Sequence, residues 1–516
     1  MSKIEANQQQ VDDGISPLRE TGKDLLWYIL ANVLPAVVSL LGISVYTRLL
    51  SPKEYGLYIL IYASICMADT LLFGWIYSTS LRYFEECRAK NNLSQYFSTM
   101  FALFLSSFLV GSVLGGILIF LFKHFLNHYW ISLLGLGILT LLTRVLYSFV
   151  IVLIRAERIT TKYGLYAAIN SFGGTLIALA LIYFFHMKAA GILLGISISS
   201  GGIALIELMQ FKKRWNLHFS FISGKMLREF TNYGIPLIAV AGSSQALSSL
   251  DRFLLQWFVG LSEVGIYSAG YSIANGFVGM PSSILYPVTY PVIIQTYERR
   301  EETDTRQFLR QIFSIYFIIM FPVLIGILAC AKLLVRFVAG SSFTKASIIM
   351  PWIGIAVFLS GISYLFLIPF QLKKRTQTML YIRVATLFIN ILLNLLFIPL
   401  VGILGAAYAF LGSCLASLAL SYFFSSRIFV WLFPWSSFLK TLLASSGMLI
   451  FLVLSMRFLK INLLALICGG TVSFIFYVLI LFLLQEENVL NFKNKGIRSL
   501  KNKYKNCRIS IGAPLS

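Results

Sequence analysis

The five residues Glu54-Tyr55-Gly56-Leu57-Tyr58 have a counterpart 209 residues later, Glu263-Val264-Gly265-Ile266-Tyr267. Each copy follows a long apolar stretch that opens on a proline, Pro35 before the first copy and Pro236 before the second. A second pair of segments, Gly191-Ile-Leu-Leu-Gly195 and Gly402-Ile-Leu-Gly405, lies at a similar offset. Weak internal similarity of this kind is typical of membrane proteins built from two structural repeats. The sequence therefore predicts two equivalent halves.

Apolar runs extend from this repeat over most of the 516 residues. Hydrophobic residues make up 58% of the chain and charged residues 12%, whereas a soluble protein has about half and about a quarter. A helix needs about twenty apolar residues to cross the hydrocarbon of a bilayer. The criterion predicts an all-α integral membrane protein with about fourteen transmembrane helices, at 25–50, 57–81, 96–122, 130–154, 163–186, 189–211, 230–259, 264–294, 307–330, 346–371, 377–400, 403–430, 437–457 and 461–484.

The predicted helices form two sets of six and a final pair. Because six is an even number, both sets enter the membrane from the same side, which makes a parallel repeat with the transport path between the halves. The predicted organisation is an N-terminal tail (1–24), an N-terminal bundle (25–211), a C-terminal bundle (230–430), helices thirteen and fourteen (437–484) and a basic tail (485–516).

The eighth predicted helix contains three prolines, Pro281, Pro287 and Pro291. Proline lacks the N–H of a helical hydrogen bond and collides with the preceding turn. We therefore expect a kink or a break in this helix, tolerated where neighbouring helices or a cavity satisfy the freed backbone groups.

Basic residues are unevenly distributed. The chain has 42 Lys and Arg against 20 Asp and Glu, a net charge of +22. On the fourteen-helix map, 31 basic residues fall on the side of the two tails and 9 on the other side. Since Lys and Arg accumulate in cytoplasmic loops, we expect both termini in the cytoplasm and no nucleic-acid partner. The segment 493–508 has seven basic residues and no acidic ones, so we expect it to bind anionic membrane lipids.

No motif of an enzyme is present. The sequence has no GxxxxGK[ST] pattern, and no predicted loop exceeds roughly twenty residues, which excludes a nucleotide-binding domain. The six cysteines are scattered singly without a CxxC spacing, and residues 1–24 lack the apolar core of a signal peptide. We expect no catalytic residues, no metal site and no cofactor. A membrane glycosyltransferase or polymerase would need clustered carboxylates or a long outside loop.

Three groups of segments carry a family resemblance. They are Asn32-Val-Leu-Pro35 with Thr47-Arg48-Leu-Leu-Ser51-Pro52-Lys-Glu54-Tyr-Gly56-Leu-Tyr58; Tyr233-Gly-Ile-Pro236 with Asp251-Arg252 and Val264-Gly265-Ile-Tyr267; and Asn390-x-x-x-Asn394 with Ile398-Pro399-x-x-Gly402-Ile-Leu-Gly405-Ala-Ala. In this order and spacing they resemble the polysaccharide flippases. This is the Wzx-type O-antigen and capsule branch of the multidrug/oligosaccharidyl-lipid/polysaccharide (MOP) exporter superfamily. The resemblance covers roughly residues 25–430.

The resemblance implies two six-helix bundles in a V that open alternately to each side of a bacterial inner membrane. It implies an oligosaccharide on undecaprenyl pyrophosphate as substrate, moved from the inner to the outer leaflet. The product would be used for lipopolysaccharide O-antigen, capsule or exopolysaccharide, with a polysaccharide polymerase and a chain-length regulator as partners. The alternative is an ion-coupled multidrug or small-metabolite exporter of the same superfamily, which acidic lumen residues would favour.

Two ionisable residues lie near the middle of predicted helices. Charged groups at that depth are expensive and are candidates for function. Arg144 is close to the midplane of the fourth helix, and Asp69 lies at matching depth in the second. Arg144 is a candidate to bind pyrophosphate through its guanidinium fork, or else to form a buried ion pair with Asp69. Asp69 is in turn a candidate to bind H⁺ or Na⁺ and couple transport to an ion gradient.

The seventh predicted helix has the widest polar face. Its members share an arc of about 100° at helical spacing, as expected for a wall that faces water. The alternative is packing between the two halves. Asp251 and Arg252 are adjacent and therefore point about 100° apart, so they should pair poorly with each other. The candidate substrate-binding residues on this face are Gln245, Ser249, Arg252 and Gln256, with Ser248 between them.

Three further charged residues lie near predicted helix ends. Arg48, Glu207 and Arg383 are each expected to extend to the membrane interface, where a long side chain keeps its charge in water.

Overall fold

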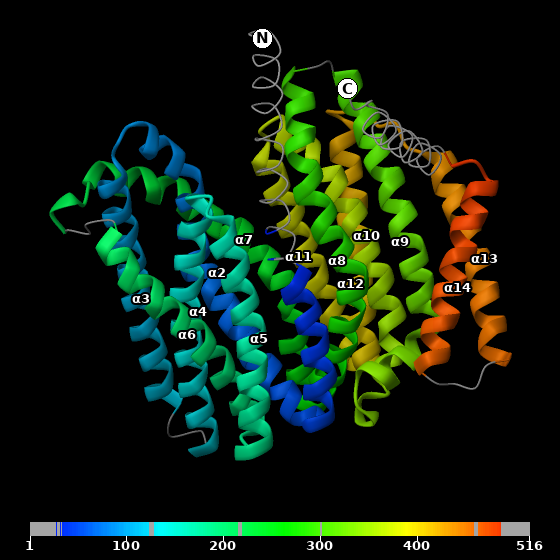
Figure 1. The fold of residues 1–516 in the computed structure, drawn as a ribbon, viewed down its shortest axis with the longest axis horizontal. Coiled ribbons are helices and arrows are strands. Elements are labelled where there is room, and N and C mark those ends of the chain that lie inside the picture. Colours follow the sequence, from blue (N-terminus) through cyan, green and yellow to red (C-terminus); the bar gives the residue numbers. More distant parts are fainter. Residues whose placement is uncertain are drawn as a thin grey trace, which may run out of the picture.

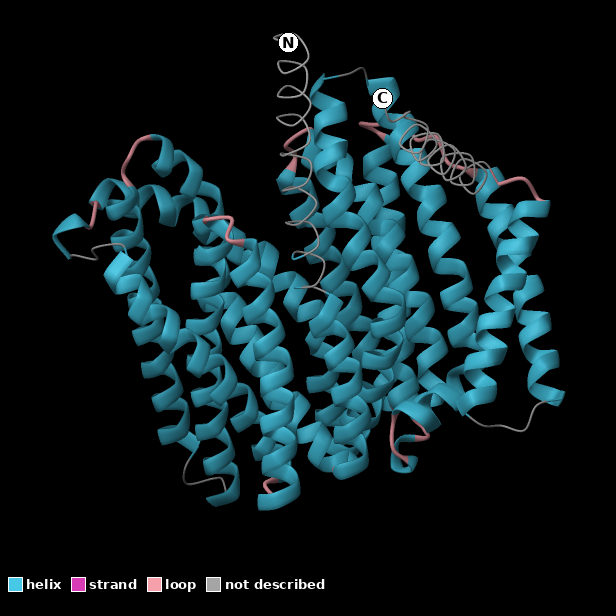
Figure 2. Cartoon of the chain, in the orientation of Figure 1, coloured by secondary structure: helices cyan, strands magenta, loops and turns pink. Residues whose placement is uncertain are grey.

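The computed structural model describes residues 27, 31, 33–122, 128–214, 219–299, 302–458 and 463–486. In these residues the regular elements are helices, without a strand (Figure 2). The first helix is Val33–Leu49. The others, labelled in Figure 1, are α2 (Pro52–Ala89), α3 (Leu93–Phe122), α4 (His128–Ala156), α5 (Thr160–Phe185), α6 (Lys188–Arg214), η1 (Phe219–Phe221), α7 (Gly224–Phe258), α8 (Leu261–Arg299), α9 (Glu302–Val338), η2 (Ser341–Phe343), α10 (Ala346–Leu372), α11 (Thr376–Val401), α12 (Ile403–Ser426), α13 (Trp435–Phe458) and α14 (Leu463–Leu483). The predicted tails 1–24 and 493–508 lie outside the described residues.

The repeated motif marks the start of two helices. Ser51 caps α2: its Oγ accepts a hydrogen bond from the Glu54 N–H, and the Glu54 carboxylate accepts one from the Ser51 N–H, both at 3.3 Å. This reciprocal capping, with Pro52 in the first turn, is a strong helix-initiation signal. Before α8, Gly260 has φ +108°, a backbone conformation that favours glycine.

The helices form two groups that approach each other at one end and diverge at the other (Figure 1). One group contains α2 to α6, and the other contains α8 to α14. We call the end where α2 and α8 begin the closed end. α7 joins the groups, because it packs against α2 on one side and α11 on the other. The V shape implied by the family resemblance is therefore present.

Two glycines of the repeated motif meet at the closed end. A Cβ added to Gly56 would overlap the Leu261 carbonyl oxygen, and a Cβ added to Gly265 would overlap the Pro52 carbonyl oxygen. The absence of side chains therefore lets the backbones of α2 and α8 touch. Close by, an Arg48 N–H donates to the Phe337 carbonyl at 2.6 Å, and the Tyr55 ring meets Phe343 edge-on. Arg48 is exposed, as an interfacial residue would be, but it also bonds the last turn of α9.

Helices α13 and α14 lie at the far side of the second group, away from the first (Figure 1). They pair with each other and pack against α9. The Tyr477 hydroxyl donates to the Ile318 carbonyl at 2.7 Å, and the Phe438 ring meets Phe317 edge-on. The pair is an addition to the outer face of α9.

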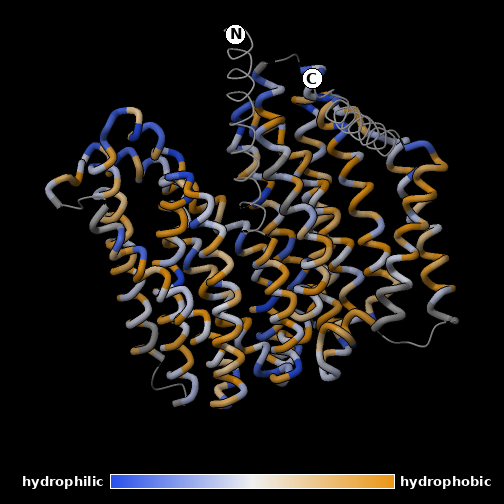
Figure 3. The backbone as a smooth tube through the Cα atoms, viewed as in Figure 1, coloured by the Kyte–Doolittle hydropathy of each residue, from blue (hydrophilic) through white to orange (hydrophobic). Residues whose placement is uncertain are grey.

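Ten of the described helices are long and apolar enough to cross a membrane, which makes this a multi-pass membrane protein. Val33–Leu49 and Gly469–Leu483 are apolar but shorter. α7 and α8 are long but more polar, because they carry Ser, Gln, Asn and charged residues between the two groups. The exact count of fourteen spans is therefore not confirmed. Hydrophilic residues gather at the helix ends and where the groups meet (Figure 3).

The break expected in the eighth helix is absent. α8 is one continuous helix from Leu261 to Arg299, through all three prolines. Hydroxyl groups bond carbonyls along and beside this stretch: Thr289 Oγ1 donates to the Leu285 carbonyl at 2.8 Å, and the Tyr286 hydroxyl donates to the Gly361 carbonyl of α10 at 2.6 Å. Such side-chain bonds and neighbouring helices allow proline within membrane helices.

Candidate functional site

A cavity of about 530 Å³ lies between the two groups of helices, within the usual size range of ligand sites. Residues from the first helix and from α2, α4, α5, α6, α7 and α8 line it. The described lining contains two arginines and no Asp or Glu. Its polar members are Ser39, Tyr46, Tyr55, Tyr58, Tyr62, Cys66, Arg144, Tyr147, Asn170, Ser171, Thr175, Gln245, Ser248, Ser249, Arg252, Tyr271 and Ser272.

Arg144 reaches this cavity from α4 and is paired with Asp69 of α2. Arg144 Nε donates to Asp69 Oδ2 at 3.2 Å, and Nη1 donates to the Tyr62 hydroxyl at 2.5 Å. The second carboxylate oxygen of Asp69 accepts from the Tyr77 hydroxyl at 2.9 Å. The Asp69 side chain is nearly buried, whereas the Arg144 side chain is partly exposed. The negative charge of Asp69 therefore offsets the positive charge that Arg144 brings to the cavity wall. The ion-pair alternative from the sequence is therefore present; a substrate role for Arg144 stays a prediction.

Arg252 reaches the same cavity from α7, and no ion pair joins it to a carboxylate in the described residues. Its Nε donates to Ser268 Oγ at 3.3 Å, and Nη1 donates to the Ser248 carbonyl. The guanidinium lies over the Tyr271 ring, 4.8 Å from its centroid. These partners are neutral. They fix the side chain without forming an ion pair with it.

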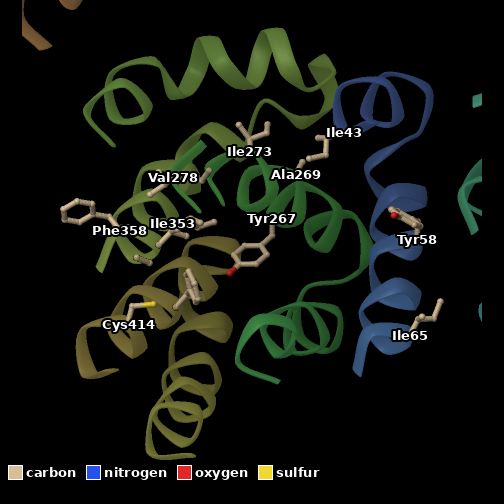
Figure 4. Close-up of a cluster of buried hydrophobic side chains, with 14 of the residues drawn as sticks. Ile43, Tyr58, Ile65, Tyr267, Ala269, Ile273, Val278, Ile353, Phe358 and Cys414 are labelled. Atoms are coloured by element: carbon tan, nitrogen blue, oxygen red, sulfur yellow. The ribbon is translucent and has the colours of Figure 1, made fainter. Parts of the chain in front are cut away.

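The neighbouring Asp251 points the other way, as the helical spacing predicted. It is 2% exposed. Its Oδ2 accepts from the Tyr267 hydroxyl at 2.9 Å, and its Oδ1 accepts from Asn394 Nδ2 of α11 at 2.8 Å. Figure 4 shows Tyr267 pointing away from Tyr58 of α2 and toward the helix that carries Cys414. Asp251 is thus a buried carboxylate held by neutral donors.

A small set of oxygens surrounds Asp251. Asn394 is fully buried, and its Oδ1 has no hydrogen-bond partner. Asn394 Nδ2 also lies 3.1 Å from Asn390 Oδ1. Carboxylate and amide oxygens are hard ligands of the kind that suit hard cations. The described residues contain no cluster of three or more His, Cys, Asp or Glu, so a transition-metal site has no candidate there.

The polar face of α7 is only partly in the cavity. Gln245, Ser249 and Arg252 line it together with Ser248. Gln245 Nε2 also donates to Ser249 Oγ at 2.9 Å. Gln256 is outside the lining, and its Oε1 is buried without a partner. Gln256 lies one turn beyond Arg252 on α7, and its place on a water-facing wall stays a prediction.

The tyrosines of the cavity were not among the substrate-binding residues predicted from the sequence. Tyr55, Tyr58 and Tyr62 follow one another at helical spacing on α2, with ring centroids 6.0 and 5.8 Å apart. Their helical spacing could have placed them on one face of the helix. It could not show that this face lines a cavity, because rows of aromatic residues also occur on lipid-facing surfaces. Asn170, Ser171 and Thr175 on α5 gave no signal. Only the packing of α5 against the cavity identifies them.

Glu207 does not extend to the interface, and this expectation was wrong. It is buried, and its carboxylate accepts from Lys162 Nζ at 2.7 Å and from the Tyr166 hydroxyl. A cation from α5 thus compensates it inside the protein. Arg383 is half-buried on α11, and its extension to the interface stays a prediction.

Known proteins are similar to this chain in sequence and in fold. The model of the family described as "Polysaccharide biosynthesis protein" matches residues 21–297, more than half of the chain. The probable flippase AglR of Haloferax volcanii is 27% identical over 281 residues, 52% of this chain and 56% of that protein. The match thus spans about half the length of this curated relative.

Solved structures show the same fold. The lipid II flippase MurJ, in an inward closed conformation, superposes with a TM-score of 0.70 and 16% identity, over 88% of this chain and 97% of that one. An inward-facing multidrug resistance MATE family transporter of the MOP superfamily gives 0.58 and 15%, over 77% and 94%. An outward-facing one also gives 0.58, at 13% identity over 78% and 95%. This chain belongs to the polysaccharide biosynthesis protein family and has the fold of MOP superfamily transporters.

Proposed function

We propose that this protein is a flippase for lipid-linked oligosaccharides and works by alternating access. The observation that carries the proposal is the cavity between the two groups of helices, whose described lining contains two arginines and no carboxylate. A lipid-linked sugar carries a diphosphate, and guanidinium groups are the side chains best suited to bind it. The hydroxyl, amide and tyrosine groups around the arginines suit the sugar.

The two-group architecture supports alternating access. The groups meet at the closed end through Gly56 and Gly265 and diverge at the other end. Solved proteins of this fold have both inward-facing and outward-facing conformations. In the proposed cycle the groups separate at the closed end and approach at the other, which exposes the cavity to the second leaflet.

The proposed setting is the one that the family resemblance and the distribution of basic residues imply. The carrier is undecaprenyl pyrophosphate in a bacterial inner membrane, both termini are cytoplasmic, and the sugar moves outward. The product serves O-antigen, capsule or exopolysaccharide assembly, with a polymerase and a chain-length regulator downstream. The rival function, export of cationic drugs, would be served by carboxylates in the cavity, and the described lining has none.

A deletion experiment tests the function in cells. A strain without this gene should lose surface polysaccharide and accumulate lipid-linked oligosaccharide on the cytoplasmic leaflet. The wild-type gene should restore both, and Arg252→Gln at equal membrane level should not. Unchanged surface polysaccharide with increased sensitivity to cationic drugs in the deletion strain would support the drug exporter instead.

We also propose that Asp251, and not Asp69, is the residue that couples transport to a H⁺ or Na⁺ gradient. Asp69 forms an ion pair with Arg144, whereas the hydrogen-bond donors to Asp251 are the neutral Tyr267 and Asn394, beside an unpartnered amide oxygen. A buried carboxylate of this kind needs a proton or a cation to balance its charge.

Gradient dependence in liposomes separates the two aspartates. Flipping by the wild type and by Asp69→Asn should speed up when a Na⁺ or H⁺ gradient is imposed. Asp251→Asn should flip at one rate with or without the gradient. The reverse pattern, with Asp69→Asn insensitive and Asp251→Asn responsive, would return the coupling role to Asp69.

A further inference from the structure

We infer that the substrate lies in the cavity in one orientation, with its diphosphate on Arg252 of α7 and its first sugar against Arg144 and the wall formed by α2 and α5. The inference rests on the proposed function and specifies how the site is used. Two arginines line the cavity, and only Arg144 forms an ion pair with a carboxylate in the described residues.

Arg144 has little net charge to offer an anion. Its Nε is engaged by Asp69 at 3.2 Å, and its Nη1 by Tyr62 at 2.5 Å. The Asp69 carboxylate is 10% exposed, so it lies behind the arginine and would repel a phosphate that approached Arg144. The part of the guanidinium that remains exposed can still donate hydrogen bonds to neutral oxygens. Sugar hydroxyls and acetyl carbonyls are such oxygens.

Arg252 is the opposite case. Its contacts are Ser268 Oγ, the Ser248 carbonyl and the Tyr271 ring, all of them neutral. The nearest carboxylate along the chain, Asp251, points to Tyr267 and Asn394 on the other face of α7. Of the two arginines that line the cavity, Arg252 is therefore the one whose guanidinium forms no ion pair with a carboxylate in the described residues. Hydrogen bonds to charged groups are also about twice as strong as neutral ones.

The lining of the cavity also contains groups suited to a sugar. α2 contributes Tyr62, which accepts a hydrogen bond from Arg144, and α5 contributes Asn170, Ser171 and Thr175 to the same lining. These hydroxyl and amide groups both donate and accept hydrogen bonds, as recognition of a sugar requires. Asn170 Oδ1 is buried and has no partner. The two arginines thus differ in their immediate partners, a carboxylate for Arg144 and neutral groups for Arg252.

Binding of inorganic pyrophosphate to the purified protein in detergent tests the orientation. The wild type should bind it, and Arg252→Gln should bind it about tenfold or more weakly, the loss expected for a charge-assisted hydrogen bond. Asp69→Asn should bind it more tightly than the wild type, because it releases the charge of Arg144. The double variant Asp69→Asn/Arg144→Gln removes the pair without leaving a buried charge; it should still bind pyrophosphate, because the diphosphate lies on Arg252 and pyrophosphate carries no sugar.

The opposite results would overturn the inference. These are no pyrophosphate binding by the wild type, an equal loss in the double variant and in Arg252→Gln, or weaker binding by Asp69→Asn. Flipping of a fluorescent lipid-linked oligosaccharide by the wild type in liposomes is measured in parallel. If the wild type flips while the pyrophosphate pattern fails, only the orientation is wrong. If it does not flip, the proposed function itself is wrong.

Discussion

At the scale of single residues, the pair Arg144–Asp69 shows how far the sequence could be read. Equal depth in two predicted helices was enough to name the pair as one of two alternatives for Arg144, and the structure contains it as a 3.2 Å ion pair. The contact between Asp251 and Asn394 could not be predicted, because the partners are 143 residues apart and meet only through the rotation of α7 against α11. The depth of a residue in the membrane can be counted along the sequence from the end of its helix. The side of the helix that faces a given neighbour depends on how the helices pack.

The buried pair predicts a non-additive effect on stability. Arg144→Gln leaves Asp69 without its cation in a buried site and should destabilise the protein by about 3–5 kcal/mol. Adding Asp69→Asn should recover most of that loss. The measurement is thermal unfolding of the purified variants, together with their level in the membrane. Additive losses in the double variant would mean that the two groups do not compensate each other.

The close contact at Gly56 predicts that a methyl group added there destabilises the protein, whereas one added at an open glycine does not. Gly56→Ala places a methyl group against the Leu261 carbonyl and should destabilise the closed end by about 1–3 kcal/mol, the range for overpacking. Gly135→Ala is the matched control, since nothing lies within 4 Å of its added Cβ. Equal melting temperatures for the two variants would contradict the close contact of α2 and α8.

At the scale of elements, apolar length predicted the apolar middle of the long helices and missed their polar ends. The prediction 346–371 matches α10 (Ala346–Leu372), which is apolar throughout. The prediction 307–330 falls short of α9 (Glu302–Val338), because its first and last turns carry Glu302, Asp304 and Arg336. Those turns continue the helix beyond the apolar stretch, where hydrophobicity gives no signal.

The polar face of α7 predicts a labelling pattern in single-cysteine variants that lack the native cysteines. Cysteines at Gln245 and Ser248 should react with a small hydrophilic thiol reagent, because both residues line the cavity. Cysteines at Gln256 and Leu255 should react slowly, since neither lines it. Fast labelling at Gln256 would show that the cavity continues past Arg252.

At the scale of the whole molecule, the basic bias predicts the orientation in the membrane. Reporters fused after residues 90, 160 and 375 should register as cytoplasmic, and reporters near 188, 262 and 341 as outside. The closed end, where α2 and α8 begin, would then face outward. A reversed pattern at two or more of these sites would reject the proposed topology.

If the proposed function is right, the purified protein alone should carry a lipid-linked oligosaccharide across the bilayer of a liposome. A fluorescent undecaprenyl-pyrophosphate oligosaccharide is bleached by a membrane-impermeant reductant, and the fraction that becomes accessible over time is measured. We expect the wild type to make the inner-leaflet pool accessible, and Arg252→Gln to leave it protected as in protein-free liposomes. If the wild type protected the inner-leaflet pool as well as protein-free liposomes do, the protein would not be a flippase for this lipid. If Arg252→Gln flipped the lipid as fast as the wild type, Arg252 would not bind it.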